Sequence, residues 1–557
     1  MKSDFNPSDC GQDVDRPKLF SVQHPFTIPS GVVSTSPSVL ARIAREVEEI
    51  GFLTTKTLSL SPRPGYREPV VHEYHPGCFI NAVGLANPGA ANFTEAMRSL
   101  LPLYARKPLL VSIMGSDPDE FLECAIILND VADAFELNLS CPHVKTAGLS
   151  VGTDPVMVGK IVGLLCDRLQ KPIVPKLSPN ITNIIEMAKV CQSAGASGLS
   201  LINTVGPGIA VDDYGNPILS NVVGGISGAA VKPIGLKLVR EVSSQVHLPI
   251  IASGGIASPW DVEAYRRAGA SYFAIGSNLA GMTTPQIKKF FRWVASPAGE
   301  GKDGRRIRTF GPKTGMTRYF RTRVASNKRI AANMFRLELD KGPKCDPGQF
   351  FFLRIPEVGE KPFSPMSDLK PVYLIRSVGP FTEKLSALEE GAEIYCRGPY
   401  GKGFQVPNEK DELLVLGGGT GVAPILLAAM KWPKNIIKAF FGFSQPLEEW
   451  FVSEIECIAP NARISIDKPG EPGAVFQSLE RAFCAPDLGI RAFRVYICGP
   501  YDMMKRAGDF FSRFVDPKEV YIAREDVMKC GIGLCGSCGT ENGLRSCIDG
   551  PVFPFSN

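Results

Sequence analysis

Four cysteines near the end of the sequence have the spacing of a site for an inorganic cluster. Cys530, Cys535, Cys538 and Cys547 form the pattern C-x4-C-x2-C-x8-C, with glycines among them. Glycine lets backbone N–H groups approach the sulfurs of a cluster, and the first three cysteines have the spacing of plant-type [2Fe–2S] proteins. Structural zinc is the alternative, but zinc sites usually combine two well-separated C-x2-C pairs. The pattern predicts a [2Fe–2S] cluster with these four thiolates as its ligands.

A further cysteine stands in a motif that can carry acid–base chemistry. Asn138-Leu-Ser-Cys141-Pro-His143 closes an apolar run. Oxidation of a saturated C–C bond next to a carbonyl needs a base for one hydrogen and a hydride acceptor for the other. Cysteine, with an ordinary pKa of about 8.5, can be that base where its surroundings favour the thiolate. An inert buried thiol is the competing interpretation of Cys141.

Lys176 and two glycine-containing pairs indicate where a hydride acceptor would bind. Lys176 stands within an otherwise apolar run, where burial without a partner would be costly. The negative charge that a flavin gains near N1 on reduction would supply that partner, whereas a lysine that reaches solvent is the alternative. Gly254-Gly255 and Gly276-Ser277 follow the last two strand-like runs of this region. Backbone N–H groups freed at such positions can bind a phosphate.

The elements that would position these residues alternate between strand and helix patterns from about residue 25 to 290. Amphipathic stretches such as 119–131 and 183–195 separate strand-like runs at 51–57, 108–115, 134–141, 172–179, 198–204, 249–256 and 271–277. This alternation predicts a (β/α)8 barrel, in which chemistry takes place at the carboxyl ends of the strands. Polar residues or glycines are expected at these ends, namely Lys56, Asn81, Asn138, Cys141, Lys176, Asn203, Thr204, Gly254, Gly255, Gly276 and Ser277.

The pattern changes after the barrel, which we place at residues 1–295. Residues 296–317 are glycine-rich, basic and aperiodic, so we expect a linker; a contact of its basic cluster with nucleic acid is the weaker alternative. Residues 318–407 show short alternating runs typical of a small antiparallel β-barrel. Residues 408–523 show a second α/β pattern, and residues 524–557 form a small cysteine-rich domain.

A glycine-rich turn in the second α/β segment indicates a nucleotide site. The run 413–424 has the pattern of a strand, a glycine turn and a helix start, and it contains Gly417-Gly418-Gly419-Thr420-Gly421. Glycine allows the backbone to approach a pyrophosphate closely, although one such turn is a weak signal. Cys498-Gly499-Pro500 follows another strand-like run, at 494–497, and would flank the same site.

Composition gives few hints about partners. The chain is 44% hydrophobic and 21% charged, with a net charge of +5, as is ordinary for soluble globular proteins. These values give no argument for a nucleic-acid or membrane partner. The first 16 residues lack an apolar core, so we expect no secretory signal. We interpret the 15 cysteines as reduced thiols plus one metal site, and we expect a cytoplasmic protein.

A series of short motifs follows in order along the N-terminal part of the sequence, at 55–57, 81–89, 136–142, 152–155, 176–180, 202–204, 224–228 and 253–256. On these motifs this part resembles the catalytic chain of dihydroorotate dehydrogenases, and the sequence as a whole resembles their NAD-dependent type (class 1B). The resemblance implies an FMN-binding TIM barrel in which Cys141 is the base at substrate C5, while N5 of the flavin takes hydride from C6. Lys56 is the other catalytic residue that it implies.

The same resemblance implies two groups of binding residues in the barrel. The FMN contacts would be Gly31, Lys56, Asn138, Lys176, Gly228, Gly254, Gly255, Gly276 and Ser277. The pyrimidine would contact Asn81, Asn138, His143, Asn203 and Thr204, with its carboxylate at the backbone of Val83, Gly84 and Leu85.

The C-terminal half resembles ferredoxin reductases and the electron-transfer partner of NAD-dependent dihydroorotate dehydrogenases. FAD would bind at Lys361, Pro362, Phe363, Ser364 and Gly379, and NAD at Gly417, Gly418, Gly419, Thr420, Gly421, Cys498 and Gly499. The relatives usually show Arg-Pro-x-Ser where this chain has Lys361-Pro-Phe-Ser364, and lysine keeps the charge but loses bidentate geometry. The resemblance thus implies two subunits fused in one chain, a homodimer or higher homo-oligomer, and a role in pyrimidine biosynthesis.

His143 departs from the pattern of dihydroorotate dehydrogenases, which usually have asparagine after Cys-Pro. Dihydropyrimidine dehydrogenases, which handle uracil and thymine, carry Cys-Pro-His. A dihydropyrimidine dehydrogenase, or another NADH-linked ene-reductase, is therefore the alternative function. A flavin-binding protein without enzymatic activity is the alternative from another class.

Overall fold

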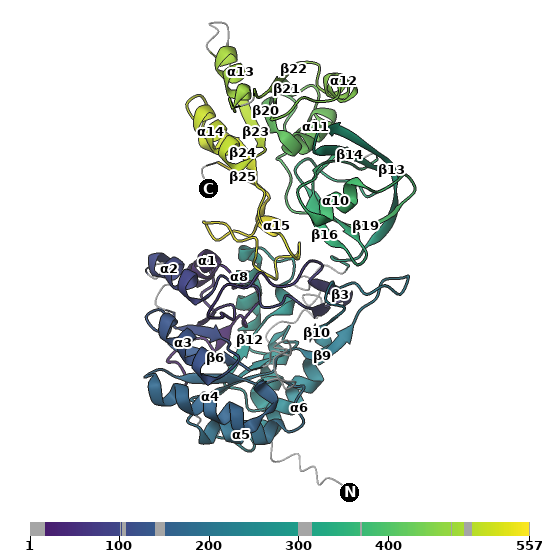
Figure 1. The fold of residues 1–557 in the computed structure, drawn as a ribbon. Helices are drawn as coiled ribbons and strands as arrows, with labels where there is room; N and C mark the ends of the chain where they lie inside the picture. The colour runs from purple at the N-terminus through teal and green to yellow at the C-terminus, as the bar shows by residue number, and fades with distance from the viewer. Residues whose placement is uncertain are drawn as a thin grey trace. The chain divides into compact units, whose positions relative to one another are not determined.

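The computed structural model describes residues 17–100, 102, 107–139, 151–298, 315–367, 370–468, 470–483 and 493–555. The chain forms two units (Figure 1). The first takes in the residues up to Gly315 and Ile532–Leu544; the second takes in Met316–Gly531 and the residues from Arg545. No helix in these ranges is long and apolar enough to cross a membrane.

Eight parallel strands of the first unit form the predicted barrel, in the order β1-β12-β11-β8-β7-β6-β5-β2. A parallel bridge between Phe26 and Ile50 joins the two ends of this order. Each of the seven predicted runs contains a strand, and the two-residue β1 had no pattern to reveal it. The strands are β1 (Phe26–Thr27), β2 (Leu53–Thr54), β5 (Leu109–Ile113), β6 (Ala134–Asn138), β7 (Ile173–Lys176), β8 (Leu199–Leu201), β11 (Ile250–Ser253) and β12 (Tyr272–Ala274).

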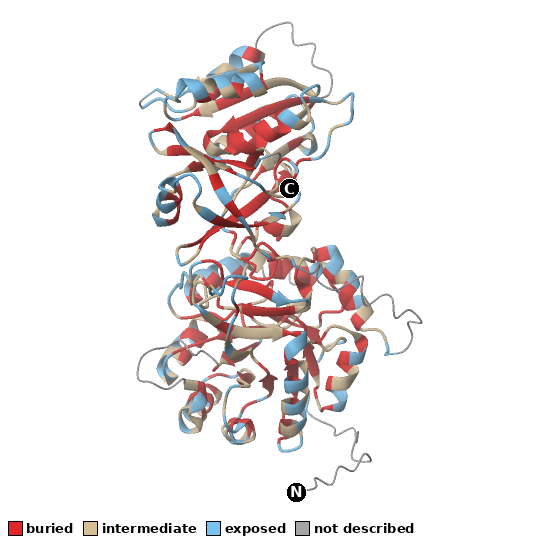
Figure 2. Ribbon diagram, turned by 90° about the vertical axis from the view of Figure 1, so that its right-hand side faces the viewer, coloured by how far each residue is buried: buried red, intermediate tan, exposed pale blue. Residues whose placement is uncertain are grey.

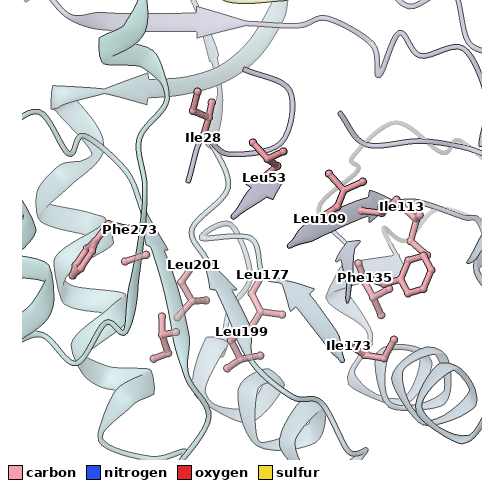
Figure 3. Packing of buried hydrophobic residues seen from close by; sticks show 14 of the residues in the cluster. Ile28, Leu53, Leu109, Ile113, Phe135, Ile173, Leu177, Leu199, Leu201 and Phe273 are labelled. Carbon is pink, nitrogen blue, oxygen red and sulfur yellow. The ribbon is translucent and has the colours of Figure 1, made fainter. Parts of the chain in front are cut away.

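Helices surround the barrel and bury its outer face. Several begin with proline directly after a capping residue: the side chain of Asp117 accepts from the Glu120 N–H, and that of Ser258 from the Asp261 N–H. Figure 3 shows Leu53, Ile173 and Leu199 within the buried apolar cluster of this unit. The helices are α1 (Pro37–Glu46), α2 (Ala90–Leu100), α3 (Pro118–Leu128), α4 (Pro155–Arg168), α5 (Ile184–Ser193), α6 (Lys232–Ser243), α7 (Pro259–Arg267) and α8 (Thr284–Val294).

A separate four-stranded antiparallel sheet corrects one expectation for the barrel. Its order is β3-β4-β10-β9, with β3 (Val71–His75), β4 (Cys78–Asn81), β9 (Val205–Ile209) and β10 (Val223–Gly228). Asn81 therefore ends a hairpin strand of this sheet, and the prediction that it ends a barrel strand was wrong. The cause is local: Gly77, at φ +70°, makes the tight β3–β4 turn, so the chain doubles back where a barrel strand would continue.

The second unit begins with a seven-stranded antiparallel sheet of order β16-β15-β19-β13-β14-β18-β17. The strand pattern expected for residues 318–407 is present, and β16 and β17 form the two edges of the sheet. Pro362 and Pro365 lie in these two strands, and proline is tolerated at sheet edges. The elements are β13 (Phe320–Ala331), β14 (Met334–Leu339), β15 (Phe350–Ile355), β16 (Gly359–Phe363), β17 (Pro365–Ser367), β18 (Val372–Arg376), α10 (Pro380–Ser386) and β19 (Glu393–Tyr400).

A six-stranded sheet completes the second unit in the doubly wound order β22-β21-β20-β23-β24-β25. Five strands are parallel; β25 comes from the cysteine-rich C-terminal segment and pairs antiparallel with β24. Figure 2 shows the central strands buried and the outer helix faces exposed. The elements are β20 (Glu412–Gly418), α11 (Val422–Lys431), β21 (Ile436–Phe443), α12 (Glu449–Ile458), β22 (Ala462–Ile466), α13 (Ala474–Phe483), β23 (Phe493–Cys498), α14 (Tyr501–Phe511), β24 (Val520–Ala523), α15 (Ser546–Asp549) and β25 (Val552–Pro554).

Candidate active site

A cavity of about 620 Å³ lies at the carboxyl ends of the barrel strands, within the first unit. This volume is in the usual range of cofactor and substrate sites. The cavity brings together every described residue predicted to contact FMN or the pyrimidine. Its wall includes Gly31, Lys56, Asn81, Val83, Gly84, Leu85, Asn138, Lys176, Asn203, Thr204, Gly228, Gly254, Gly255, Gly276 and Ser277. Cys141 and His143 lie outside the described residues.

Lys176 is held by a carboxylate that the sequence analysis did not single out. Its Nζ lies 3.6 Å from Oε1 of Glu136, and the two side chains are 6% and 3% exposed. Glu136 also accepts a hydrogen bond from the Ser112 hydroxyl, at 2.9 Å. A buried cation needs such a partner. The sequence contains part of the signal, because Glu136 and Lys176 are both charged residues inside apolar strand patterns. The structure adds that β6 pairs with β7.

A chain of hydroxyl and amide groups connects this ion pair to the rest of the cavity wall. The Ser112 and Thr57 hydroxyl oxygens lie 3.0 Å apart, and the Asn138 amide donates to Thr57 at 3.0 Å. The Asn203 amide in turn donates to the Asn138 side-chain oxygen at 3.4 Å. Asn138 and Asn203, which stand far apart in the sequence, are therefore oriented by one network. Buried polar groups that are satisfied in this way are fixed in position.

The predicted phosphate-binding backbone is kept free of side chains by close packing. Gly228, Gly254 and Gly255 have φ values of +91°, +119° and +72°. A Cβ on Gly255 would stand 2.8 Å from the Gly228 carbonyl oxygen. Tyr265, a residue that the sequence analysis missed, donates to the Gly254 carbonyl at 2.6 Å, and burial raises the pKa of its hydroxyl. The tyrosine therefore stays a donor and fixes the turn.

The 83–85 loop has an unusual backbone. Gly84 and Leu85 both have positive φ, +70° and +56°, although left-handed backbone is uncommon for leucine. The Asn87 side chain supports the loop: its amide donates to the Leu85 carbonyl at 2.8 Å, and its oxygen accepts from the Gly89 N–H at 2.9 Å. Strain of this kind persists where the surroundings enforce it and is typical of binding sites. Asn87 is a positioning residue that the motif 81–89 contained.

Thr204, which is predicted to contact the pyrimidine, lines the cavity and packs against a glycine of the antiparallel sheet. A Cβ on Gly225 would stand 2.1 Å from the Thr204 hydroxyl oxygen, so no other residue fits at that position. The Asn203 side-chain oxygen accepts from the Thr204 N–H at 2.8 Å. This hydrogen bond holds Asn203 and Thr204 in a fixed relative position at the cavity wall.

Residues 532–544 of the predicted cluster segment fold as part of the first unit. The Val33 N–H donates to the Leu534 carbonyl at 2.7 Å, and the Thr35 hydroxyl donates to the Cys535 carbonyl at 2.5 Å. Leu534 and Cys535 both line the cavity. Gly536, at φ +69°, passes so close to the Val33 carbonyl that a Cβ would stand 2.7 Å from it. A predicted cluster ligand therefore lies at the wall of the predicted flavin site.

The four predicted cluster cysteines are all buried. Cys535 and Cys538 belong to the first unit, and Cys530 and Cys547 to the second. Within neither unit do three or more described His, Cys, Asp or Glu residues gather as metal ligands. Gly531, Gly533 and Gly536 have positive φ, so the loop between the first cysteines turns at glycines. Buried thiols on a glycine-rich loop fit a cluster, whose sulfurs accept hydrogen bonds from nearby N–H groups.

The predicted FAD residues lie on an edge strand of the seven-stranded sheet. Lys361, Pro362 and Phe363 are in β16, and Ser364 follows it. The ring of Phe363 stacks on that of Phe381, with centroids 6.4 Å apart. Phe381 belongs to α10, which begins directly after Gly379. The structure therefore brings the two predicted FAD segments, 361–364 and 379, to the same place.

The predicted NAD residues lie at the switch point of the six-stranded sheet. Neighbouring strands β20 and β23 end in Gly418 and Cys498, and the strand order reverses between them. Ligands of doubly wound sheets bind at this point. The two turns touch: a Cβ on Gly421 would stand 2.6 Å from the Gly499 nitrogen. Burial raises the pKa of the Cys498 thiol, so it stays protonated at neutral pH.

Arg376 is a further residue near this turn that the sequence analysis missed. Its Nη2 lies 2.9 Å from where a Cβ of Gly419 would stand. Burial raises the pKa of Glu525, and the charge of Arg376 acts against that rise. Arg376 ends β18, so it also belongs to the sheet that carries the predicted FAD residues. An arginine at a glycine turn is suited to binding phosphate oxygens.

Two family models match the chain. Residues 19–291 match dihydroorotate dehydrogenase, and residues 525–557 match the iron-sulfur cluster binding domain of dihydroorotate dehydrogenase B. One chain therefore contains a segment similar to each.

Curated relatives match less than half of the chain. A protein of Pyrococcus abyssi, dihydroorotate dehydrogenase B (NAD(+)), catalytic subunit, is 43% identical over 262 residues, which are 46% of this chain and 85% of that protein. Proteins with the same name from Pelobacter propionicus and Methanothermobacter thermautotrophicus are 42% and 39% identical, over 44% and 46% of this chain and 80% and 84% of their own lengths.

Proposed function

The chain belongs to the dihydroorotate dehydrogenase family, and from this premise we propose that it oxidises dihydroorotate to orotate and transfers the electrons to NAD+. When bound, FMN would supply a hydride acceptor for the substrate, the [2Fe–2S] cluster single-electron transfer, and FAD hydride transfer to NAD+. One observation carries the proposal: all described residues of the predicted FMN and pyrimidine sets line the same cavity.

Charge at the cavity wall supports a flavin that becomes negative on reduction. Lys56 and Lys176 are both buried at this wall, each 5% exposed. Glu136 lies beside Lys176 and holds its ammonium in place. Positive charge fixed in a low-dielectric wall stabilises an anionic group next to it. These residues would therefore favour the reduced form of FMN and hold its ring.

Amide groups at the cavity wall support a pyrimidine as substrate. Asn81, Asn138 and Asn203 each offer one acceptor and two donor hydrogens, the complement of a ring with alternating carbonyl and N–H groups. The left-handed backbone at Gly84 and Leu85 can turn successive N–H groups toward an anion, which suits the substrate carboxylate. We assign the base to Cys141, which follows Asn138 by three residues in the sequence.

The position of residues 532–544 supports electron transfer out of the barrel. Leu534 and Cys535 line this cavity, and their backbone carbonyls accept hydrogen bonds from Val33 and Thr35, close in sequence to Val32 of the cavity wall. A cluster held by Cys535 would therefore have one ligand at the edge of the FMN site. Within the second unit, the two predicted FAD segments lie next to each other, and the predicted NAD residues lie at the switch point of the six-stranded sheet. Both observations support electron transfer through FAD to NAD+.

Anaerobic flavin reduction tests the choice of substrate. Dihydroorotate should bleach the FMN absorbance far faster than dihydrouracil or dihydrothymine at equal concentration, because only dihydroorotate carries the carboxylate. His143→Asn should preserve this preference. Faster bleaching by dihydrouracil would assign the protein to the dihydropyrimidine dehydrogenases, which the His143 motif resembles. No bleaching by any of the three would point to another ene-reductase.

A further inference from the structure

A fully buried ion pair lies in the seven-stranded sheet of the second unit. The Arg397 and Glu360 side chains are 1% and 0% exposed. Nη2 of Arg397 lies 2.5 Å from Oε1 of Glu360, and Nε lies 2.9 Å from Oε2, so the contact is bidentate. The two residues come from β19 and β16, on either side of β15. The guanidinium crosses β15 over the ring of Phe352, 3.9 Å from its centroid.

Stability alone does not account for such a pair. The free-energy cost of removing two charges from water is about as large as the gain from their attraction. A protein in which apolar residues replace such a pair is therefore often as stable. Both members of the pair nevertheless make further hydrogen bonds. The Tyr319 hydroxyl donates to Oε2 of Glu360 at 2.5 Å, and Nη1 of Arg397 donates to the Tyr400 hydroxyl at 2.8 Å. These hydrogen bonds hold the guanidinium of Arg397 in one position, and we expect another group to depend on that position.

That other group is the first predicted cluster cysteine. Nη1 of Arg397 also donates to the backbone carbonyl of Cys530, at 2.9 Å. The next residue, Gly531, has φ +77°, and a Cβ there would stand 2.9 Å from Phe352 Cε2 and 3.3 Å from Arg397 Nη1. The peptide group between Cys530 and Gly531 is therefore packed against the Arg397 guanidinium and the Phe352 ring. The positive φ of Gly531 and these close contacts disfavour any larger residue at this position.

We propose that Arg397 is a positioning residue for the iron–sulfur cluster: it fixes Cys530 and, with Glu360, sets the reduction potential of the cluster. The inference rests on the proposed function, in which Cys530 is a ligand. Reduction adds one negative charge to the cluster. A cation bonded to a ligand residue in a low-dielectric interior stabilises that charge, and a carboxylate behind the cation opposes it. Arg397 therefore raises the potential, and Glu360 lowers it.

The two charges give the test opposite signs. In the full-length holoenzyme, EPR spectra of the reduced cluster recorded at set potentials give its midpoint, and iron and sulfide analysis gives its content. Arg397→Gln should lower the midpoint and Glu360→Gln should raise it. We expect at least about a tenfold change in the reduced-to-oxidised ratio at a fixed potential, or about 59 mV for one electron. Arg397→Lys keeps the charge and should restore most of the midpoint; Glu360→Gln carries the test if Arg397→Gln contains no iron.

A control separates this role from general support of the sheet. Arg336 on β14 is also ion-paired, to Glu338 and Glu454, and Arg336→Gln should leave the midpoint unchanged. Wild-type midpoints in both Arg397→Gln and Glu360→Gln, or shifts of the same sign in both variants, would overturn the inference. Zinc instead of iron in the wild-type protein would overturn the proposed function itself, and that result is distinguishable from an unchanged potential.

Discussion

Glu136→Gln tests whether the barrel holds the charge of Lys176 at the flavin site. Glu136 Oε1 and Lys176 Nζ are 3.6 Å apart, and both side chains are nearly buried. At an effective dielectric constant of about 20, two unit charges at this distance attract by about 4–5 kcal/mol. Breaking one side of a buried pair costs about 3–5 kcal/mol. Glutamine keeps the size and can still accept from Ser112, so the FMN-free barrel should lose roughly this free energy of unfolding.

The same substitution should raise the midpoint potential of bound FMN. Without the carboxylate, the charge of Lys176 is available to the negative reduced flavin, which is then favoured over the oxidised form. Flavin absorbance at set potentials measures the midpoint anaerobically, and denaturant unfolding of FMN-free protein measures the stability. Ser112→Ala removes the hydroxyl that contacts Glu136 and Thr57 but no charge; it should cost about 1 kcal/mol and leave the midpoint nearly unchanged. A destabilised Glu136→Gln protein with an unchanged or lower FMN midpoint would refute the position of Lys176 beside the flavin.

Three further predictions address the base, the NAD site and one buried thiol. Cys141→Ala should retain FMN but slow its reduction by dihydroorotate about 10²–10⁴-fold in anaerobic stopped flow, because a positioned base is lost; an unchanged rate would place the base elsewhere. Gly421→Ala should weaken NADH binding and slow flavin reduction by NADH, since its Cβ would stand 2.6 Å from the backbone of Cys498 and Gly499. The control Gly163→Ala, whose Cβ meets nothing within 4 Å, should behave as wild type, and equal rates in both variants would contradict the assignment. Because burial raises the pKa of Cys498, iodoacetamide at about pH 8 should label the exposed Cys457 and leave Cys498 unmodified until the protein unfolds. Mass spectrometry measures the labelling, and modification of native Cys498 would contradict its burial.

The barrel could be predicted because its strands are apolar runs bounded by turn residues. Runs such as 108–115 and 249–256 carry this signal by themselves, since parallel strands are buried on both faces. β1 lies between Pro25 and Pro29 and is only two residues long, which is too short for a periodic pattern of apolar and polar residues. The edge strands β16 and β17 contain proline, which weakens a strand pattern.

The residues of the barrel cavity could be predicted from the sequence, but the hydrogen bonds between them could not. Motifs place Asn138, Lys176 and Gly254 at strand ends, and the barrel then brings them to one cavity. The hydrogen bonds of Glu136 and Tyr265 depend on which strands and helices become neighbours, and no local pattern contains that information. Asn81 shows the converse: its place at the cavity was expected, but a hairpin of another sheet brings it there.

The cysteine-rich segment is divided in a way that its sequence does not reveal. Its 532–544 part folds with the first unit, whereas β25 completes the six-stranded sheet of the second. Cysteine spacing predicts ligands but gives no information about which surfaces the intervening loop will contact. A homodimer or higher homo-oligomer and a cytoplasmic location stay predictions.

The proposed function depends most on the route of electrons from the barrel to NAD+ through the cluster held in part by Cys535. Its most direct test compares wild-type protein with Cys535→Ser, mixed anaerobically with dihydroorotate and NAD+, by following FMN absorbance, orotate and NADH together. The wild type should form one NADH for each orotate. In Cys535→Ser, dihydroorotate should still bleach FMN at the wild-type rate, but NADH formation should fall steeply. NADH formation at the wild-type rate in a variant whose cluster EPR signal is lost would contradict the account.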